Sequence, residues 1–84
     1  MIRKLVITEP GRRSLKKMPR EAQRQILKKI TEYDGKPDLI AAHLKHMTDS
    51  KPPMSRLRMG DFRAFGHAEG ETLYMDIFLD KKDV

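Results

Sequence analysis

The stretch "SRLRMGDFRAFGH", Ser55–His67, decides the fold. Apolar and polar residues alternate on both sides of Gly60-Asp61, a pattern typical of two antiparallel strands joined by a tight turn. Three arginines, Arg56, Arg58 and Arg63, lie within this hairpin. Because side chains alternate between the two faces of a strand, all three are expected on the same face. The stretch therefore predicts a hairpin with one basic face.

The rest of the chain divides into segments of helical and strand periodicity. One α+β domain over residues 1–84 is expected, with an N-terminal strand, a two-helix hairpin and then a three-stranded antiparallel meander, the helices lying on one face of the sheet. The boundaries are a strand at Ile2–Thr8, a helix opening at Glu9-Pro10, a second helix at Pro19–Tyr33, and strands at Met54–Met59, Phe62–His67 and Thr72–Leu79. Pro37–Met47 fits one or two helical turns, and Thr48–Pro53 fits a loop.

Alternation assigns each side chain to the buried or the open face of this sheet. The second helix buries a stripe made of Ala22, Ile26, Ile30 and Tyr33, which Leu27 widens. The residues expected beneath the helices are Leu57, Met59, Phe62, Ala64, Gly66, Leu73, Met75, Ile77 and Leu79. Those expected on the open face are Arg56, Arg58, Arg63, Phe65, His67, Tyr74, Asp76, Phe78 and Asp80.

Positive charge is concentrated at the start of the chain. The net charge is +6, residues 1–33 contributing +7 and residues 34–84 contributing −1. A basic surface of this density attracts polyanions, of which nucleic acid is the commonest. Arg20, Arg24, Lys28 and Lys29 of the second helix are candidate backbone contacts, although a solvated basic helix face explains them equally well.

Composition argues against several other classes of protein. The 84 residues contain no cysteine and no apolar segment long enough to span a membrane or to form a signal-peptide core. A cytoplasmic protein without cofactor or membrane partner is expected. His43 and His46 are the nearest approach to a metal site, but no further ligand stands at matching spacing, so no metal is expected.

Guanidinium groups among aromatic rings suit single-stranded nucleic acid, since phosphates accept from arginine and bases stack on rings. The alternative is that another protein chain or the C-terminal tail covers Phe65 and Phe78. The arginines would then form ordinary ion pairs, Arg63 with Asp61 or Glu71, and Arg56 and Arg58 with Asp76 or Glu69.

"RLRMGDFRAF" (Arg56–Phe65), preceded by "LKKMP" (Leu15–Pro19), resembles the RelE/ParE superfamily of bacterial toxin–antitoxin systems, whose members show a Leu-Lys-Lys-Leu-Pro-like hinge and an "RLRVGDYRV" hairpin. "HLKHM" (His43–Met47) stands where the family has a Lys-Leu segment, and "LDKKDV" (Leu79–Val84) where it has its C-terminal tail. The resemblance covers nearly the whole chain.

The resemblance implies a toxin neutralised by a cognate antitoxin, with a toxin–antitoxin heterotetramer as one possible assembly. RelE-like members cleave mRNA on the ribosome without metal, and this branch is favoured. ParE-like members inhibit DNA gyrase instead. On the RelE model Arg63 holds the scissile phosphate, Arg56 matches an active-site lysine of RelE, and Arg58 matches a retained family arginine of partly structural role.

The tail departs from the family pattern. Asp80-Lys81 stands in place of His-Arg, Lys82 follows, and the terminal tyrosine of RelE is absent. Lys81 is a candidate catalytic cation and Lys82 a candidate phosphate contact, while His67 is a candidate acid or base. The alternatives are a gyrase inhibitor and a catalytically degenerate homologue that only binds an antitoxin.

Overall fold

The computed structural model describes residues 1–49 and 51–84. Three α-helices, five strands and one short 3₁₀ helix follow one another within these residues. In order they are β1 (Lys4–Ile7), α1 (Glu9–Lys16), α2 (Arg20–Tyr33), α3 (Pro37–His43), β2 (Leu44–Met47), β3 (Met54–Met59), β4 (Phe62–Glu69), β5 (Thr72–Asp80) and a 3₁₀ helix, Lys81–Asp83. The expected strand, helix pair and meander are present, and α3 and β2 are additional to them.

The five strands form one mixed sheet in the order β1-β5-β4-β3-β2. β2 to β5 are antiparallel, and β1 pairs with β5 in parallel. Gly60 and Gly70 have φ of 62° and 58° at the first central positions of the two tight turns. Positive φ at that position with glycine is typical of type II′ hairpins, whose twist matches that of the strands. The expected Gly60-Asp61 turn is confirmed.

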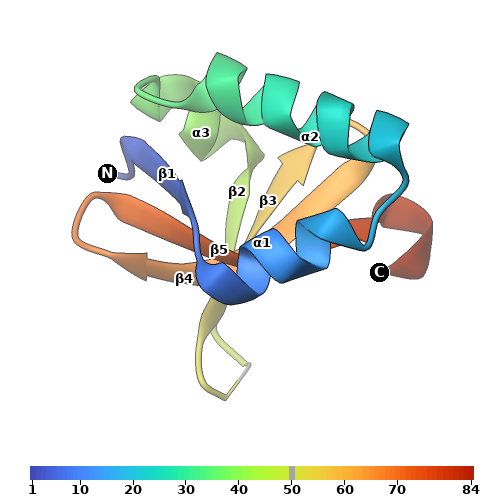
Figure 1. Ribbon diagram of the computed structural model, residues 1–84. Helices are drawn as coiled ribbons and strands as arrows, with labels where there is room; N and C mark the ends of the chain where they lie inside the picture. The colour runs from blue at the N-terminus through green and yellow to red at the C-terminus, as the bar shows by residue number, and fades with distance from the viewer. Residues whose placement is uncertain (50) are drawn as a thin grey trace.

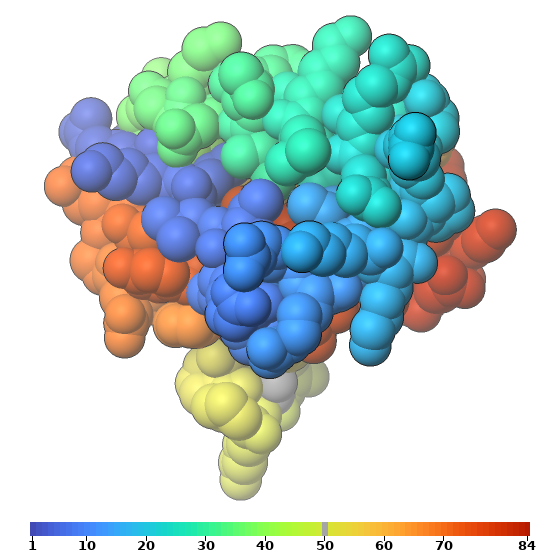
Figure 2. All heavy atoms as spheres, in the orientation of Figure 1, coloured from blue at the N-terminus to red at the C-terminus, as the bar shows by residue number. Residues whose placement is uncertain are grey.

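The helices cover one face of the twisted sheet, as Figure 1 shows. The core between the two layers consists mainly of Leu15, Ala22, Ile26, Tyr33 and Ile40 from the helices and Leu57, Met59, Phe62, Ala64, Leu73, Met75 and Phe78 from the sheet. Figure 2 shows the helical side, with the described residues of the segment between β2 and β3 projecting away from the rest. None of the helices in the described residues is long and apolar enough to cross a membrane.

The predicted faces hold for β3, β4 and the first half of β5, and fail in its second half. Phe65 pairs with Ile77, but Gly66 pairs with Met75, so Asp76 is an extra residue in β5. This β-bulge reverses the alternation beyond it. Phe78 is therefore buried with 2% exposure, whereas Ile77 is 41% exposed.

Four assignments are corrected by this bulge: Phe78 and Asp80 are not on the open face, and Ile77 and Leu79 are not beneath the helices. Leu79 pairs with Arg63 on the open face, and Asp80 pairs with the buried Phe62. The assignment of Leu27 to the buried stripe of the second helix is also wrong, because its side chain is 46% exposed.

The segment before the hairpin is the other difference. Pro37–His43 is helical, as one reading of the sequence allowed, but Leu44–Met47 forms the edge strand β2. The meander has four strands instead of three, and the chain has three helices instead of two. The alternation in "LKHM" is too short to distinguish a strand from a helical turn. Thr48–Pro53 lacks helix and strand in its described residues, and Ser50 of this expected loop lies outside them.

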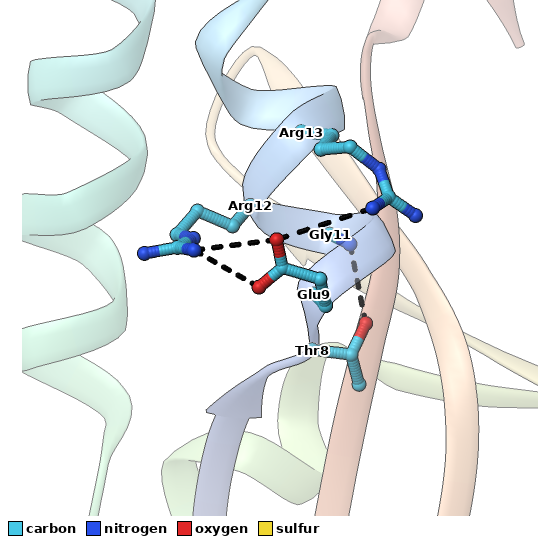
Figure 3. A network of polar contacts seen from close by, with 5 residues as sticks. All are labelled: Thr8, Glu9, Gly11, Arg12 and Arg13. Atoms are coloured by element: carbon cyan, nitrogen blue, oxygen red, sulfur yellow. Dashed lines mark hydrogen bonds and ion pairs between the residues drawn. The ribbon is translucent and has the colours of Figure 1, made fainter.

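Helix α1 lies beside β5 beyond the point where β1 ends. Thr8 caps the helix by accepting from the backbone N–H of Gly11 at 3.1 Å, and Glu9 in the first turn contacts both Arg12 and Arg13 (Figure 3). One turn later the Ser14 hydroxyl accepts from the backbone N–H of Phe78 at 2.9 Å. A side chain of α1 thus replaces the missing strand partner of β5.

The bulge depends on a glycine. A β-carbon at Gly66 would lie 1.7 Å from the carbonyl oxygen of Tyr74, so no larger residue fits without moving the backbone. Glycine within a strand often marks such a close backbone approach.

Gly66→Ala should lower the free energy of unfolding by about 3 kcal/mol, because the added methyl group forces β4 and β5 apart. Chemical denaturation followed by circular dichroism measures the loss. Ala68→Gly, which alters an exposed position of the same strand, is the control and should cost less than about 1 kcal/mol. Equal stability of the Gly66 variant and the wild type would contradict the bulge.

Candidate nucleic-acid interface

The strand register brings the three hairpin arginines together on the open face. Arg58 pairs with Arg63 directly across the hairpin, and Arg56 pairs with Phe65 two residues further along. On the other side Arg56 pairs with Lys45 of β2. Two rows therefore cross the sheet: Lys45–Arg56–Phe65–Ile77 and Arg58–Arg63–Leu79. Each row runs from cations to apolar side chains.

A hollow lies at the cationic end of these rows. It has a volume of about 150 Å³ and is lined by Ala42, His43, Leu44, Lys45, Arg56 and Arg58. Two strands supply its three cationic side chains, and α3 supplies part of its wall. Lys45 was not a candidate residue in the sequence, because β2 was not predicted there.

Four cations lie on the open face, namely Lys45, Arg56, Arg58 and Arg63. None of them forms an ion pair with a carboxylate among the described residues. The pairs considered for Arg63 do not form, because other cations occupy the carboxylates: Glu71 contacts Arg3 at 2.7 Å, and Asp61 contacts Lys81 at 3.1 Å. Like charges placed directly opposite on a sheet destabilise it. The Arg58–Arg63 pair is therefore a cost to the fold that a bound anion would remove.

The guanidinium of Arg63 is held in place by its own hairpin. One terminal nitrogen donates to the backbone carbonyl of Gly60 at 2.8 Å and to that of Phe62 at 2.9 Å. Both bonds use the same nitrogen, Nη1, so Nε and Nη2 keep their protons for a ligand. The side chain is fixed in direction before any anion arrives.

The C-terminal residues lie at the same turn. The backbone N–H of Lys81 donates to the carbonyl of Asp61 at 2.9 Å, and its side chain pairs with the Asp61 carboxylate. Lys81 is thus brought to the hairpin end that carries Arg63. Asp80 accepts from the N–H of Lys82 and is directed away from the open face, so it does not repel an anion there. Lys82 is exposed and borders the groove beneath α1.

His67 lies at the far end of the same face. Its Nδ1 contacts the Asp76 carboxylate at 3.1 Å, and its ring stacks on Tyr74 with centroids 5.3 Å apart. It lies four residues along the strand from Arg63, a distance of roughly 13 Å. It is diagonal to Arg56, within about 8 Å between β-carbons. The structure therefore places His67 near the Arg56 row and not near Arg63.

The basic residues of α2 lie on the helical side, apart from the arginine face. Arg24 pairs with Glu21 at 2.9 Å, and this hydrogen bond lowers the pKa of Glu21 and raises the pKa of Arg24. Lys29 pairs with Glu32 at 3.5 Å and borders the Gly60-Asp61 turn together with Lys28. Arg20 and Lys28 are exposed without an ion pair among the described residues.

The two histidines considered as metal ligands have other contacts. His43 stacks on Tyr33 with ring centroids 5.0 Å apart, and Nδ1 of His46 contacts the hydroxyl of Ser55 at 2.7 Å. The described residues contain no group of three or more metal-ligating side chains close enough to hold an ion.

Comparison with known proteins identifies the architecture. No protein-family model and no curated protein matches the sequence. The structure matches a chain in the crystal structure of the archaeal RelE–RelB complex from Pyrococcus horikoshii OT3 with a TM-score of 0.63, over 100% of both chains and at 14% sequence identity. The protein has a RelE-like fold. At 14% sequence identity the match establishes the fold alone.

Arg58→Thr should raise the stability of the isolated protein by about 0.5 kcal/mol at low salt, because it removes one of two opposed guanidinium groups and introduces a strand-forming residue. Thermal unfolding at 20 mM and 1 M salt measures the change, and the gain should shrink at high salt. Arg58→Lys keeps the charge and should leave the stability unchanged. A less stable Arg58→Thr variant would show that the opposed pair is not a cost.

Proposed function

We propose that this protein is the toxin of a type II toxin–antitoxin system, a RelE-like interferase that cleaves mRNA on the ribosome in the cytoplasm. The observation that carries the proposal is the group of four cations on the open face, Lys45, Arg56, Arg58 and Arg63, none of which has a carboxylate partner among the described residues. The RelE-like fold supports it independently.

The arginines supply the electrostatic part of RNA cleavage. Attack of a 2′-hydroxyl on the adjacent phosphate builds negative charge on the phosphoryl oxygens, and preorganised donors stabilise that charge most effectively. Arg63 suits this role because the carbonyls of Gly60 and Phe62 already fix its guanidinium. No reorganisation of that side chain is needed when the charge develops.

Two groups beside the arginines are suited to proton transfer. His67 donates Nδ1–H to Asp76 when that carboxylate is ionised, which leaves Nε2 free to accept a proton near Arg56. The Lys81 ammonium at the hairpin turn is a donor for the leaving 5′-oxygen. We assign Lys81 as the acid, because it lies at the hairpin end that carries Arg63, and Arg56 and Arg58 as phosphate contacts. His67 serves as the base for a phosphate held at Arg56. Lys82, which borders the groove beneath α1, is a candidate only for a more distant phosphate. Of the α2 residues, Arg20 and Lys28 are the better candidates for further backbone contacts, because Arg24 and Lys29 are ion-paired.

A second function is favoured by one observation. His67 and Lys81 lie at opposite ends of the arginine face, so a single phosphate cannot contact both without movement of a side chain. A toxin that inhibits gyrase, or a degenerate homologue that only binds an antitoxin, needs no such pair. Both alternatives use the same fold.

The matching structure contains a RelB chain as well as RelE. We propose that a cognate antitoxin likewise binds this protein. Its apolar open-face residues, Ile77 at 41% and Val6 at 38% exposure, are available for such a contact.

Arg63→Ala should reduce message cleavage in a translating extract by about 10²–10³-fold, because it removes a fixed donor to the phosphoryl oxygens. Mapping of message ends measures the loss. Arg3→Ala, which removes an arginine paired with Glu71 away from this face, is the matched control and should change cleavage less than twofold.

Uncut message at concentrations where the wild-type protein binds ribosomes would contradict the nuclease. Gyrase cleavage complexes trapped in a parallel supercoiling assay would then support the gyrase alternative. Absence of both activities would leave the antitoxin-binding homologue.

A further inference from the structure

We propose that the apolar half of the open face is a nucleobase subsite, in which Phe65 and Ile77 hold the base of a nucleotide whose phosphate lies in the hollow formed by Lys45, Arg56 and Arg58. The proposal rests on the proposed RNA-binding function and adds to it the residues that contact the base. A single-stranded RNA is the occupant.

The strand register places the side chains proposed to bind the phosphate next to those proposed to bind the base. Phe65 is directly opposite Arg56 on one strand and Ile77 on the other, so the aromatic ring lies between a guanidinium and an aliphatic side chain on the same face. Directly opposed positions have β-carbons about 4.5–5.5 Å apart. A phosphate bound at Arg56 therefore leaves its own base over Phe65 and Ile77.

The second row repeats the arrangement at a matching distance. Arg58 and Arg63 lie two residues along the strands from Arg56 and Phe65, a displacement of about 6.7 Å, and the row ends in Leu79. An extended single strand advances by a similar distance per nucleotide. The face therefore fits two consecutive nucleotides, with phosphates along β3 and bases toward β5.

The bulge at Asp76 creates the apolar half. Regular alternation would place Asp76, Phe78 and Asp80 on this face, and two of the three would bring carboxylates next to a phosphate. The extra residue places Ile77 and Leu79 there in place of Phe78 and Asp80. Asp76 remains half-buried and is occupied by hydrogen bonds from Thr8 at 2.7 Å and His67 at 3.1 Å.

Charge favours nucleic acid over a protein segment as the occupant. The two rows contain four cations and no carboxylate, and the ring at their centre is aromatic. Base stacking on an aromatic ring beside arginine is the usual recognition of single strands on sheet surfaces. The Tyr74 ring is partly engaged by His67, so Phe65 is the main stacking surface.

The test is equilibrium binding of a fluorescent 2′-deoxy oligonucleotide, which cannot be cleaved, to the whole protein. Phe65→Leu keeps an apolar side chain but removes the ring, and should weaken binding roughly tenfold. Phe65→Tyr should restore it. An abasic oligonucleotide of equal length should bind the wild type and Phe65→Leu with equal affinity, because only phosphates remain.

Arg56→Ala is the complementary variant. It should weaken binding of both oligonucleotides and reduce the dependence of log K on log salt by about 0.7, whereas Phe65→Leu leaves that slope unchanged. Circular dichroism and thermal unfolding confirm that each variant is folded before its affinity is compared.

Equal affinity of wild type and Phe65→Leu for the base-bearing strand would overturn the subsite, as would an equal loss for the abasic strand. If Phe65→Leu instead abolishes capture of an antitoxin while oligonucleotide binding is unchanged, the face is a protein-binding surface and the subsite is wrong. If Phe65→Leu loses base-dependent binding while the wild-type protein cuts no message, the subsite is supported and the nuclease is rejected.

Discussion

The contact on which the open face depends is between two backbones, at Gly66 of β4 and Tyr74–Met75 of β5. The missing β-carbon of Gly66 admits the Tyr74 carbonyl, and this approach accommodates Asp76 as the extra residue. Beyond it Phe78 turns into the core and Ile77 out of it. The same bulge aims the Asp76 carboxylate at Thr8, the residue that caps α1. One inserted residue thus fixes both the core and the composition of the exposed face.

The sequence predicts the faces of the hairpin strands correctly and those of the second half of β5 incorrectly. One physical rule explains both outcomes. Faces follow from a period of two only while the pairing is regular, and Arg56, Arg58 and Arg63 lie in such a region. In β5 the alternation of Leu73 and Met75 with Ile77 fits an unbroken strand equally well. The available signal was Gly66 inside a strand, which is typical of a bulge. Sequence alone does not reveal which strand receives the extra residue.

The candidate site was predicted in part. The three arginines lie together as expected, but Lys45 was missed because "LKHM" is too short to identify as an edge strand from periodicity. The partners of the charged residues were also beyond prediction. Glu71 and Asp61 were expected near Arg63, yet they contact Arg3 and Lys81, since those pairings depend on how the turns and the C-terminal 3₁₀ helix pack.

The arrangement of charge argues for a ligand on grounds of stability. A domain of 84 residues has a small core and only a few kcal/mol of net stability. It contains twelve acidic residues, enough to pair each arginine of the hairpin. Instead Glu9 forms ion pairs with two arginines of α1, Glu21 pairs with Arg24, and Asp61 pairs with Lys81. These carboxylates pair with cations of the helices and the turns, so the opposed Arg58 and Arg63 keep their charge for an external anion.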